Sequence, residues 1–280
     1  MIDLAKISTN LEPAPDGQWR SKTSSAISYP DWGNEACFQV EDSSFWFRHR
    51  NACILEAMKQ FPPPGPVFDV GGGNGFVAKG MQDAGLEVAL VEPGVTGARN
   101  AQRRGVQSVI CATLESAGFI PGSLTAVGLF DVVEHIENDH KFITMIWNQL
   151  RPGGRVYITV PAYNALWSQE DFDAGHQRRY GLRGLHDLLT QAGFWVDFLT
   201  GFFQFLGPAI VAGRVLPYRL GLAKSPDPTS VGSHMKQQHV IQSSVVGKVL
   251  TWLQQRETTA ISARRELRSG ASWLLVARKP

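Results

Sequence analysis

The residues with the clearest chemical potential are two acids that flank a cluster of glycines. Asp69 leads into the glycine-rich run Gly71–Gly75, and Glu92 ends the next apolar run along the chain. Glycine allows positive φ angles and lets a ligand touch the main chain with no Cβ in the way. An acid at the end of the second strand of a nucleotide-binding unit can accept hydrogen bonds from ribose hydroxyls. The combination predicts a backbone cradle for a ligand that contains a nucleoside.

The glycine spacing separates two kinds of nucleotide site. A dinucleotide fingerprint needs G-x-G-x-x-G, and with Gly71 and Gly73 as its first glycines the third position is Phe76. The sequence instead reads D-x-G-x-G-x-G over residues 69–75 and so resembles motif I of the class I methyltransferases that use S-adenosylmethionine (SAM). A tight strand-to-helix turn without a ligand is the alternative, and the position of Glu92 argues against it.

The resemblance implies where SAM would bind. Asp69 and the loop backbone would hold the methionine part, and Glu92 would hold both ribose hydroxyls. Residues 112–114 would flank the adenine, although an ordinary strand exit fits them equally well. Residues 130–132 would lie near the methyl end. The implied cofactor set is Asp69, Gly71, Gly72, Gly73, Asn74, Gly75, Glu92, Pro93, Ala112, Thr113, Leu114, Phe130, Asp131 and Val132.

An N-terminal helix adds two candidates to this set. Ser43 or Ser44 could cap a helix that runs to about Met58. On it, Trp46 and Arg50 could close over the cofactor, with Arg50 reaching the cofactor carboxylate. Helical spacing favours the alternative that these side chains belong to an aromatic stripe packing the helix on the core.

Three further segments extend the resemblance over most of the chain. Residues 129–136 look like the F-D-x-x-x-E-H-I segment of the small-molecule branch, as in quinone-biosynthesis O-methyltransferases. Residues 150–160 look like the L-x-P-G-G segment that opens strand 5 of the fold. Residues 175–180 resemble a G-H-x-R-R-Y stretch of bacterial members and indicate a subgroup without naming a substrate.

His135, His176 and Tyr180 are the candidates for the acceptor side. The sulfonium methyl group of SAM is already activated, so the protein must place the acceptor in line with it. A hydroxyl or ammonium acceptor also needs a base, and an imidazole titrates close to neutral pH. His135 has an equally weighted structural alternative as a helix cap. A loop pinned by Arg178, Arg179 and Tyr180 is the favoured alternative for His176.

Composition limits the partners and the compartment. The chain has 27 basic and 25 acidic residues and a net charge of +2, which gives no basic excess for nucleic acid. Cys37, Cys53 and Cys111 are far apart, so we expect no disulfide framework, no metal ligands and a cytoplasmic location. The N-terminus is not typical of a signal peptide. The longest uncharged run, residues 198–213, is shorter than the ~20 residues of a membrane span, so no integral membrane segment is expected.

Apolar runs and helical patterns alternate along the middle of the chain, which predicts parallel strands joined by crossover helices. An apolar content of 43% is enough for a core. With the resemblance, we expect an α/β fold: a Rossmann-like, seven-stranded, mostly parallel sheet with helices on both faces. The last apolar run, residues 271–278, would be strand 7, antiparallel between strands 5 and 6.

Around this core we expect two additions. Residues 1–60 would form an N-terminal arm, loose over its first ~30 residues on composition, and a cap helix. Residues 61–280 would form the methyltransferase domain, with 204–269 inserted as a cap between strands 6 and 7. The cap would contain a polar loop, 224–238, and a helix, 240–256.

The resulting prediction is an enzyme that transfers a methyl group from SAM to a small-molecule acceptor, with oxygen as the preferred atom, and releases S-adenosylhomocysteine. One alternative is a hydrophobic or lipid-linked acceptor, methylated during peripheral membrane contact through residues 202–216. Another is a SAM-binding scaffold without turnover. The oligomeric state stays open.

Overall fold

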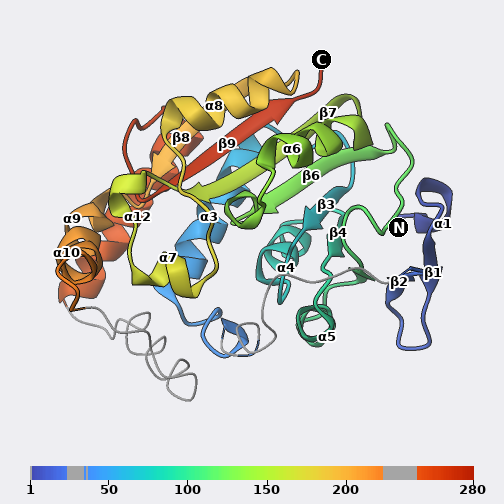
Figure 1. The fold of residues 1–280 in the computed structure, drawn as a ribbon, viewed down its shortest axis with the longest axis horizontal. Coiled ribbons are helices and arrows are strands. Elements are labelled where there is room, and N and C mark those ends of the chain that lie inside the picture. Colours follow the sequence, from blue (N-terminus) through green and yellow to red (C-terminus); the bar gives the residue numbers. More distant parts are fainter. Residues whose placement is uncertain (1, 24–34, 36, 223–244) are drawn as a thin grey trace.

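The computed structural model describes residues 2–23, 35, 37–222 and 245–280, and its centre is a nine-stranded sheet (Figure 1). The strand order is β1-β2-β5-β4-β3-β6-β7-β9-β8. The strands are β1 Leu11–Pro13, β2 Trp19–Ser21, β3 Val67–Val70, β4 Val88–Val91, β5 Ser108–Cys111, β6 Leu124–Phe130, β7 Leu150–Pro161, β8 Trp195–Phe202 and β9 Ser272–Arg278.

The predicted fold class is confirmed. Strands β3 to β7 pair in parallel, and β9 pairs antiparallel with both β7 and β8. All four residues of β3 and of β4 are buried, as expected for parallel strands covered on both faces.

The number of strands and the loose N-terminal arm were predicted wrongly. Residues 4–21 form the short helix α1 Leu4–Ile7 and the hairpin β1–β2, and β2 adds to the sheet beside β5, with Trp19 opposite Ile110. The buried side chains of Leu4 and Leu11 anchor this hairpin in the core. Only a few apolar residues anchor the hairpin, and the residues around them are mostly polar. The composition of this segment therefore did not predict an ordered structure.

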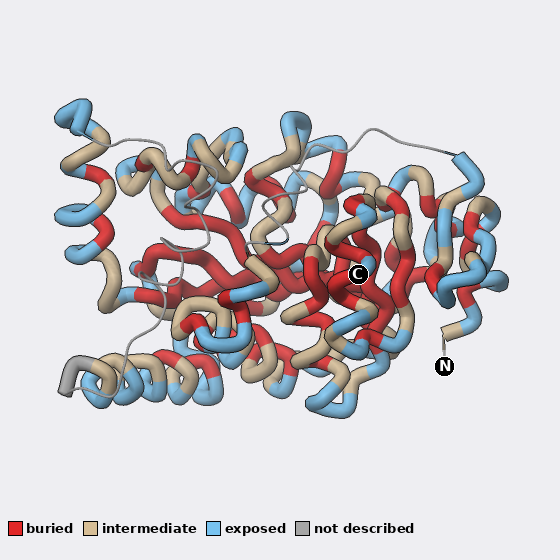
Figure 2. The backbone as a smooth tube through the Cα atoms, turned by 90° about the horizontal axis from the view of Figure 1, so that it is seen from below, coloured by how far each residue is buried: buried red, intermediate tan, exposed pale blue. Residues whose placement is uncertain are grey.

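Helices cover both faces of the sheet. The long helices are α3 Phe45–Gln60, α4 Phe76–Asp83, α5 Val95–Arg103, α6 Asp139–Gln149, α8 Leu182–Gln191 and α12 Val245–Ser262. Because side chains alternate along a strand, β3 contributes to two cores. Phe68 packs with α6 and α8 on one face, and Val67 packs with α3, α4 and α5 on the other. Figure 2 shows the buried residues concentrated in the sheet between exposed helices.

Between β8 and β9 the chain leaves the sheet. It forms η3 Gln204–Leu206, α9 Gly207–Ile210, η4 Val211–Val215 and α10 Leu216–Arg219, and it returns through α12 along α3 (Figure 1). The predicted polar loop 224–238 and the first residues of the predicted helix 240–256 lie outside the described residues. Among the described residues, no helix has both the length and the apolar character that crossing a membrane requires.

Candidate functional site

The glycine loop joins β3 to α4 in a conformation that excludes larger side chains. Gly71, Gly73 and Gly75 have φ angles of +70°, +52° and +75°. A Cβ on Gly71 would lie 2.9 Å from Val132 Cγ2, and one on Gly75 would lie 2.8 Å from Ala101 Cβ. The loop therefore requires glycine for both its backbone angles and its close packing.

Beneath this loop lies a buried acid. Asp69 is fully buried, and among the described residues neither of its carboxylate oxygens accepts a hydrogen bond of ordinary geometry. Burial raises the pKa of Asp69 to about 7, against the opposing effect of the Arg50 guanidinium. A Cβ on Gly72 would lie 2.8 Å from both Asp69 Oδ2 and Leu90 Cδ1, so the absence of a side chain at Gly72 lets the loop pack directly against this carboxylate. A buried carboxylate of this kind favours a cation.

Glu92 ties the end of β4 to the same loop. Its Oε2 accepts a hydrogen bond from the Gly73 amide at 2.9 Å, and its Oε1 accepts one from the Gly94 amide at 2.7 Å. Glu92 also opposes ionisation of Asp69, because like charges repel. Two neighbouring acids and a glycine cradle fit SAM, which carries positive charge on its sulfonium and ammonium groups and a ribose between them.

The predicted adenine segment follows β5. The side chains of Ala112 and Leu114 are buried in the core, so only their main chain could face a ligand. Thr113 forms a closed turn with Ser116, with N–H to hydroxyl distances of 3.0 Å in both directions. Pro93 lies beside this strand, with its carbonyl 3.8 Å from Cys111 Sγ.

The predicted methyl end lies after β6. Asp131 has a φ angle of +57°. Its carboxylate accepts a hydrogen bond from Thr159 Oγ1 at 2.9 Å and is ion-paired with Arg50. Phe130 is buried in the core, whereas Val132 packs over Gly71. The sequence predicted that Arg50 would reach a cofactor carboxylate, and the structure places its guanidinium on Asp131 at the edge of the same loop.

Trp46 takes the packing role that helical spacing favoured. Its ring stacks on Phe203 with a centroid distance of 3.9 Å and an interplanar angle of 14°. It thereby joins α3 to the turn after β8. The structure gives Trp46 this intramolecular partner, whereas Arg50 of the same helix pairs with Asp131.

A polar network that sequence reasoning missed holds the loop from its other side. Glu41 accepts hydrogen bonds from Asn74 Nδ2 at 3.2 Å and from Arg104 Nη2 at 2.8 Å. Asn100 Nδ2 donates to Asn74 Oδ1 at 3.0 Å. These residues are far apart in sequence, and a charge at position 41 before a helix gave no signal of this contact.

The two histidines predicted for the acceptor side lie face to edge. The rings of His135 and His176 are 4.9 Å apart between centroids, at 76°. Burial and then the neighbouring His176 lower the pKa of His135 to about 4. His176 Nδ1 lies 2.8 Å from Asp171 Oδ1, and Asp171 also accepts a hydrogen bond from Arg179 Nε at 2.7 Å. Sequence reasoning missed Asp171.

This pair also has the ligand types of a metal site. Glu134, His135 and His176 each offer one ligand atom, and these atoms lie within 4.8 Å of one another. Glu134 is fully buried, and burial raises the pKa of its carboxyl group well above the usual range. The cluster can therefore hold protons or a divalent cation, whereas the sequence predicted no metal ligands.

Tyr180 is engaged elsewhere. Its hydroxyl donates to Asp139 Oδ2 at 2.9 Å and lies 3.3 Å from the Val133 carbonyl oxygen. Burial, followed by the hydrogen bond to Asp139, raises the pKa of Tyr180 well above its usual value. This arrangement pins the loop after β7 and leaves the hydroxyl unsuited to accept a proton.

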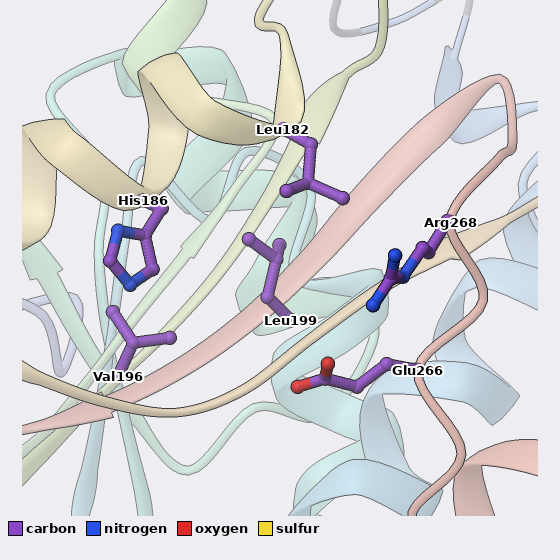
Figure 3. A pocket seen from close by; sticks show the side chains of 6 residues that line it. All are labelled: Leu182, His186, Val196, Leu199, Glu266 and Arg268. Atoms are coloured by element: carbon purple, nitrogen blue, oxygen red, sulfur yellow. The ribbon is translucent and has the colours of Figure 1, made fainter.

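A separate hollow of about 410 Å³ lies between α8, β8 and the segment that leads into β9 (Figure 3). Because β8 is the outermost strand, this hollow is several strands away from the glycine loop. It does not belong to the site built from the strand ends. Its lining residues are Leu182, His186, Val196, Leu199, Glu266 and Arg268.

Comparison with known proteins identifies the family to which the chain is similar. A family model described as "Methyltransferase domain" matches residues 46–197. A ubiquinone biosynthesis O-methyltransferase of Pectobacterium carotovorum subsp. carotovorum (strain PC1) is 26% identical over 143 residues. That match covers 47% of this chain and 60% of the relative, so the chain spans less than two thirds of it.

Solved structures show the same fold. A Haemonchus contortus phosphoethanolamine N-methyltransferase 2 in complex with SAM has a TM-score of 0.54 at 18% identity, over 94% of this chain and 62% of that one. The [4+2]-cyclase SpnF has a TM-score of 0.54 at 15% identity, over 92% and 99% of the two chains. At these identities the likeness concerns the fold alone.

Proposed function

The chain belongs to the methyltransferase domain family, and from that premise we propose that it transfers a methyl group from SAM to the oxygen of a small-molecule acceptor. The observation that carries the proposal is the buried carboxylate of Asp69 under a loop that only glycine can form. Glu92, held by amides of that loop and of the following turn, supports it. When bound, SAM supplies a methyl group that its sulfonium sulfur already activates.

In this proposal the position of each residue determines whether it binds the cofactor or contacts the acceptor. Asp69, Glu92 and the loop backbone hold the cofactor, with Arg50 and Asp131 at the methyl end. His135 and His176 lie beyond the same edge of the sheet and are the candidates for removing the acceptor proton. The ubiquinone O-methyltransferase relative supports oxygen as the acceptor atom.

We also propose that the described parts of the predicted insertion 204–269, residues 204–222 and 245–269, cover the acceptor side as a cap. Arg214 of η4 contacts Glu170 at 3.2 Å, and Arg219 of α10 donates to the Ala165 carbonyl oxygen at 3.0 Å. Both contacts hold the cap against the segment that carries His176.

Calorimetric titration with SAM tests the cofactor part. Glu92→Ala removes a charged hydrogen-bond acceptor worth about 1.5–3 kcal/mol, so we expect SAM affinity to fall roughly 10- to 100-fold. Glu115→Ala, an exposed acid on a neighbouring turn, is the matched control and should bind as the wild type does. Equal affinity in both variants would remove Glu92 from the site.

Release of S-adenosylhomocysteine tests turnover. The [4+2]-cyclase with the same fold shows that this scaffold also serves other chemistry, so cofactor binding alone does not establish methyl transfer. A panel of hydroxyl acceptors, with 3,4-dihydroxybenzoate as the catechol probe, should release S-adenosylhomocysteine above the acceptor-free rate. Tight SAM binding without release across the panel would favour the scaffold alternative.

A specific observation supports a lipid-linked acceptor as a second candidate. Leu216, Leu220 and Leu222 are 48%, 70% and 71% exposed, close to Arg219 at the end of α10. Apolar side chains beside a cationic one suit a membrane surface. Flotation with vesicles that contain anionic lipid decides this point, because Leu220→Ser with Leu222→Ser should abolish any binding. If the wild-type protein stays in the soluble fraction, the candidate is dismissed.

A further inference from the structure

We propose that Glu134, His135 and His176 form a binding site for one divalent transition-metal ion, with Zn²⁺ as the preferred ion. Each of the three side chains offers one ligand atom, and these atoms lie within 4.8 Å of one another. A metal site here goes beyond the proposed function, because it exists whether or not the chain transfers a methyl group. Metal binding can therefore be tested separately from cofactor binding.

The first support is the environment of the Glu134 carboxylate. Glu134 is fully buried, and in the part of the chain that the structure describes neither of its carboxylate oxygens has a hydrogen-bond partner of ordinary geometry. The neighbouring guanidinium groups are already paired, that of Arg50 with Asp131 and that of Arg179 with Asp171. A buried carboxylate is costly unless it is paired or coordinates a metal, and an ion held between Glu134 and the histidines removes that cost.

The second support is that both histidine rings have the outer partners typical of metal ligands. His176 Nδ1 lies 2.8 Å from Asp171 Oδ1, and a hydrogen bond to the Gly175 main chain engages the ring of His135. Histidines that bind a metal through one ring nitrogen usually donate the other N–H to a carboxylate or a main-chain carbonyl, which orients the ring. Both kinds of partner are present here. Because Asp171 engages Nδ1 of His176, Nε2 is the atom of that ring that can bind the ion.

The third support is that the fold holds the two segments with the ligands together. The Gln177 amide donates to the Glu134 carbonyl oxygen at 2.8 Å, which ties the His176 loop to η1 Val133–His135. The centroids of the two histidine rings are 4.9 Å apart. With zinc–nitrogen distances of about 2.1 Å in a tetrahedral site, two ligand atoms lie about 3.4 Å apart. We therefore expect small side-chain rotations to close the site around an ion.

The types of ligand select the ion. Two imidazole nitrogens and one carboxylate suit Zn²⁺, whereas Mg²⁺ and Ca²⁺ bind mainly to oxygen ligands. Three protein ligands leave the fourth position of a tetrahedral zinc open to water, as in catalytic rather than structural zinc sites. The side chain of His176 is 17% exposed, so an ion can enter from solvent. Coordination uses the ring lone pairs, so under the proposed function a metal-loaded site makes His135 and His176 ligands instead of bases.

Titration of the full-length, untagged protein with Zn²⁺ tests the site. After chelator treatment and dialysis, we expect calorimetry and elemental analysis to give one tightly bound Zn²⁺ per chain, which an equal concentration of Mg²⁺ does not displace. His176→Ala removes a ligand and should weaken Zn²⁺ binding by more than the roughly 10- to 100-fold that the loss of an outer partner costs. His186→Ala is the matched control, because His186 is exposed beside Asp187, and it should bind Zn²⁺ as the wild type does.

Glu134→Gln tests the carboxylate ligand and does not depend on the folding of His176→Ala. The amide keeps the size of the side chain but removes its charge, so stoichiometric Zn²⁺ binding should be lost while far-ultraviolet circular dichroism stays unchanged. Replacing Zn²⁺ by Co²⁺ identifies the type of ligand. Thiolate ligands from Cys37, Cys53 or Cys111 would give an intense ultraviolet charge-transfer band, and we expect a Co²⁺ spectrum without this band.

Any of four results would overturn the proposal. These are a wild-type protein without stoichiometric Zn²⁺, displacement of Zn²⁺ by an equal concentration of Mg²⁺, a thiolate band with Co²⁺, and wild-type Zn²⁺ affinity in a folded His176→Ala or Glu134→Gln protein. Calorimetry of the metal-free protein with S-adenosylhomocysteine separates this failure from that of the proposed function. Binding of S-adenosylhomocysteine without binding of Zn²⁺ overturns the metal site alone. Binding of Zn²⁺ without binding of S-adenosylhomocysteine supports the metal site and contradicts the proposed function.

Discussion

Single buried charges dominate the chemistry at the scale of residues. Burial and then the neighbouring Glu92 oppose the ionisation of Asp69, and the Arg50 guanidinium offsets part of that cost. A folded protein tolerates a buried charged side chain when a ligand of opposite charge pairs with it. The arrangement therefore connects cofactor binding to the protonation of Asp69, and this connection can be measured.

The first prediction is a pH dependence of SAM affinity. Because burial raises the pKa of Asp69 to about 7 in the free protein, the carboxyl is largely protonated below that pH and attracts a cation weakly. Affinity should rise by up to about tenfold per pH unit from pH 5.5 toward 7 and then level off, and binding below pH 7 should release protons. Titrations in buffers of different ionisation enthalpy measure both effects.

Asp69→Asn is the control for this dependence. The amide cannot titrate, so the variant should bind weakly and equally at pH 5.5 and 7.5. A wild-type affinity that is flat over this range would contradict the role of Asp69. A slope that persists in Asp69→Asn would place the titrating group elsewhere.

The residues found from sequence and those missed differ in one respect. Asp69, the glycines and Glu92 were predictable because they share one local strand–loop–helix–strand unit, in which spacing alone sets their geometry. Asp171 and Glu41 act through partners that only folding brings close, such as His176 and Asn74. Arg50 was predicted to reach a cofactor carboxylate, whereas its ion pair with Asp131 depends on the turn after β6.

At the scale of elements, a buried hydrogen bond between a histidine and a carboxylate joins α12 to α3. Glu257 of α12 lies 2.7 Å from His49 Nε2 of α3. The same carboxylate accepts hydrogen bonds from the amides of Phe203 and Gln204, at 2.9 and 2.7 Å. Phe203 adopts a φ angle of +60° at this point, so Glu257 stabilises a turn that is otherwise unfavourable.

The second prediction follows from that pair. Glu257→Ala leaves His49 and two buried amides without their acceptor, and leaving buried donors unsatisfied costs at least about 1–3 kcal/mol. We expect the free energy of unfolding, measured by urea denaturation, to fall by about this amount. Glu266→Ala, an exposed acid four residues beyond the end of α12, should change it little. A loss below about 1 kcal/mol would mean that Glu257 does not hold the cap.

The third prediction separates the packing of the glycine loop from its backbone angle. Gly71 and Gly122 have nearly equal φ angles, +70° and +72°, but a Cβ on Gly122 meets nothing within 4 Å. Gly122→Ala should therefore cost only the left-handed strain, about 1–2 kcal/mol. Gly71→Ala adds the contact with Val132, about 1–3 kcal/mol more, and should also lower SAM affinity.

Urea denaturation and SAM titration of both alanine variants measure these two effects. Equal stability losses in the two variants would show that Val132 moves away freely. Unchanged SAM affinity in Gly71→Ala would place the ligand away from this part of the loop.

Elements were predictable to different degrees. The Ser44-capped helix α3 was expected within a few residues, because capping is a local signal. The path between β8 and β9 was expected only as an insertion. Its short helices and the π-helical turn η4 depend on contacts with α7 Gln169–Asp173 and α3, which no local pattern contains.

At the scale of the whole molecule, the N-terminal hairpin protects an edge of the sheet. The parallel core would otherwise end at β5, whose outer hydrogen-bonding edge β2 now occupies. Ser8 Oγ donates to the Ala117 carbonyl oxygen at 2.6 Å, which fixes the hairpin on the turn after β5. The seven-stranded core was predictable from the alternation of strands and helices, but this addition was not.

The last prediction is that a chain without residues 2–23 exposes that edge. The deletion removes the buried side chains of Leu4 and Leu11, which are 2% and 6% exposed, and burying a leucine is worth about 1.5–3 kcal/mol. We expect the free energy of unfolding to fall by about 3–6 kcal/mol and the unpaired strand to promote association. Denaturation and light scattering after size exclusion measure these two changes. Leu4→Ala with Leu11→Ala keeps the strand pairing, so it should lower stability without association. If the deleted chain behaves as the double variant does, the hairpin contributes packing alone and the edge of β5 needs no cover.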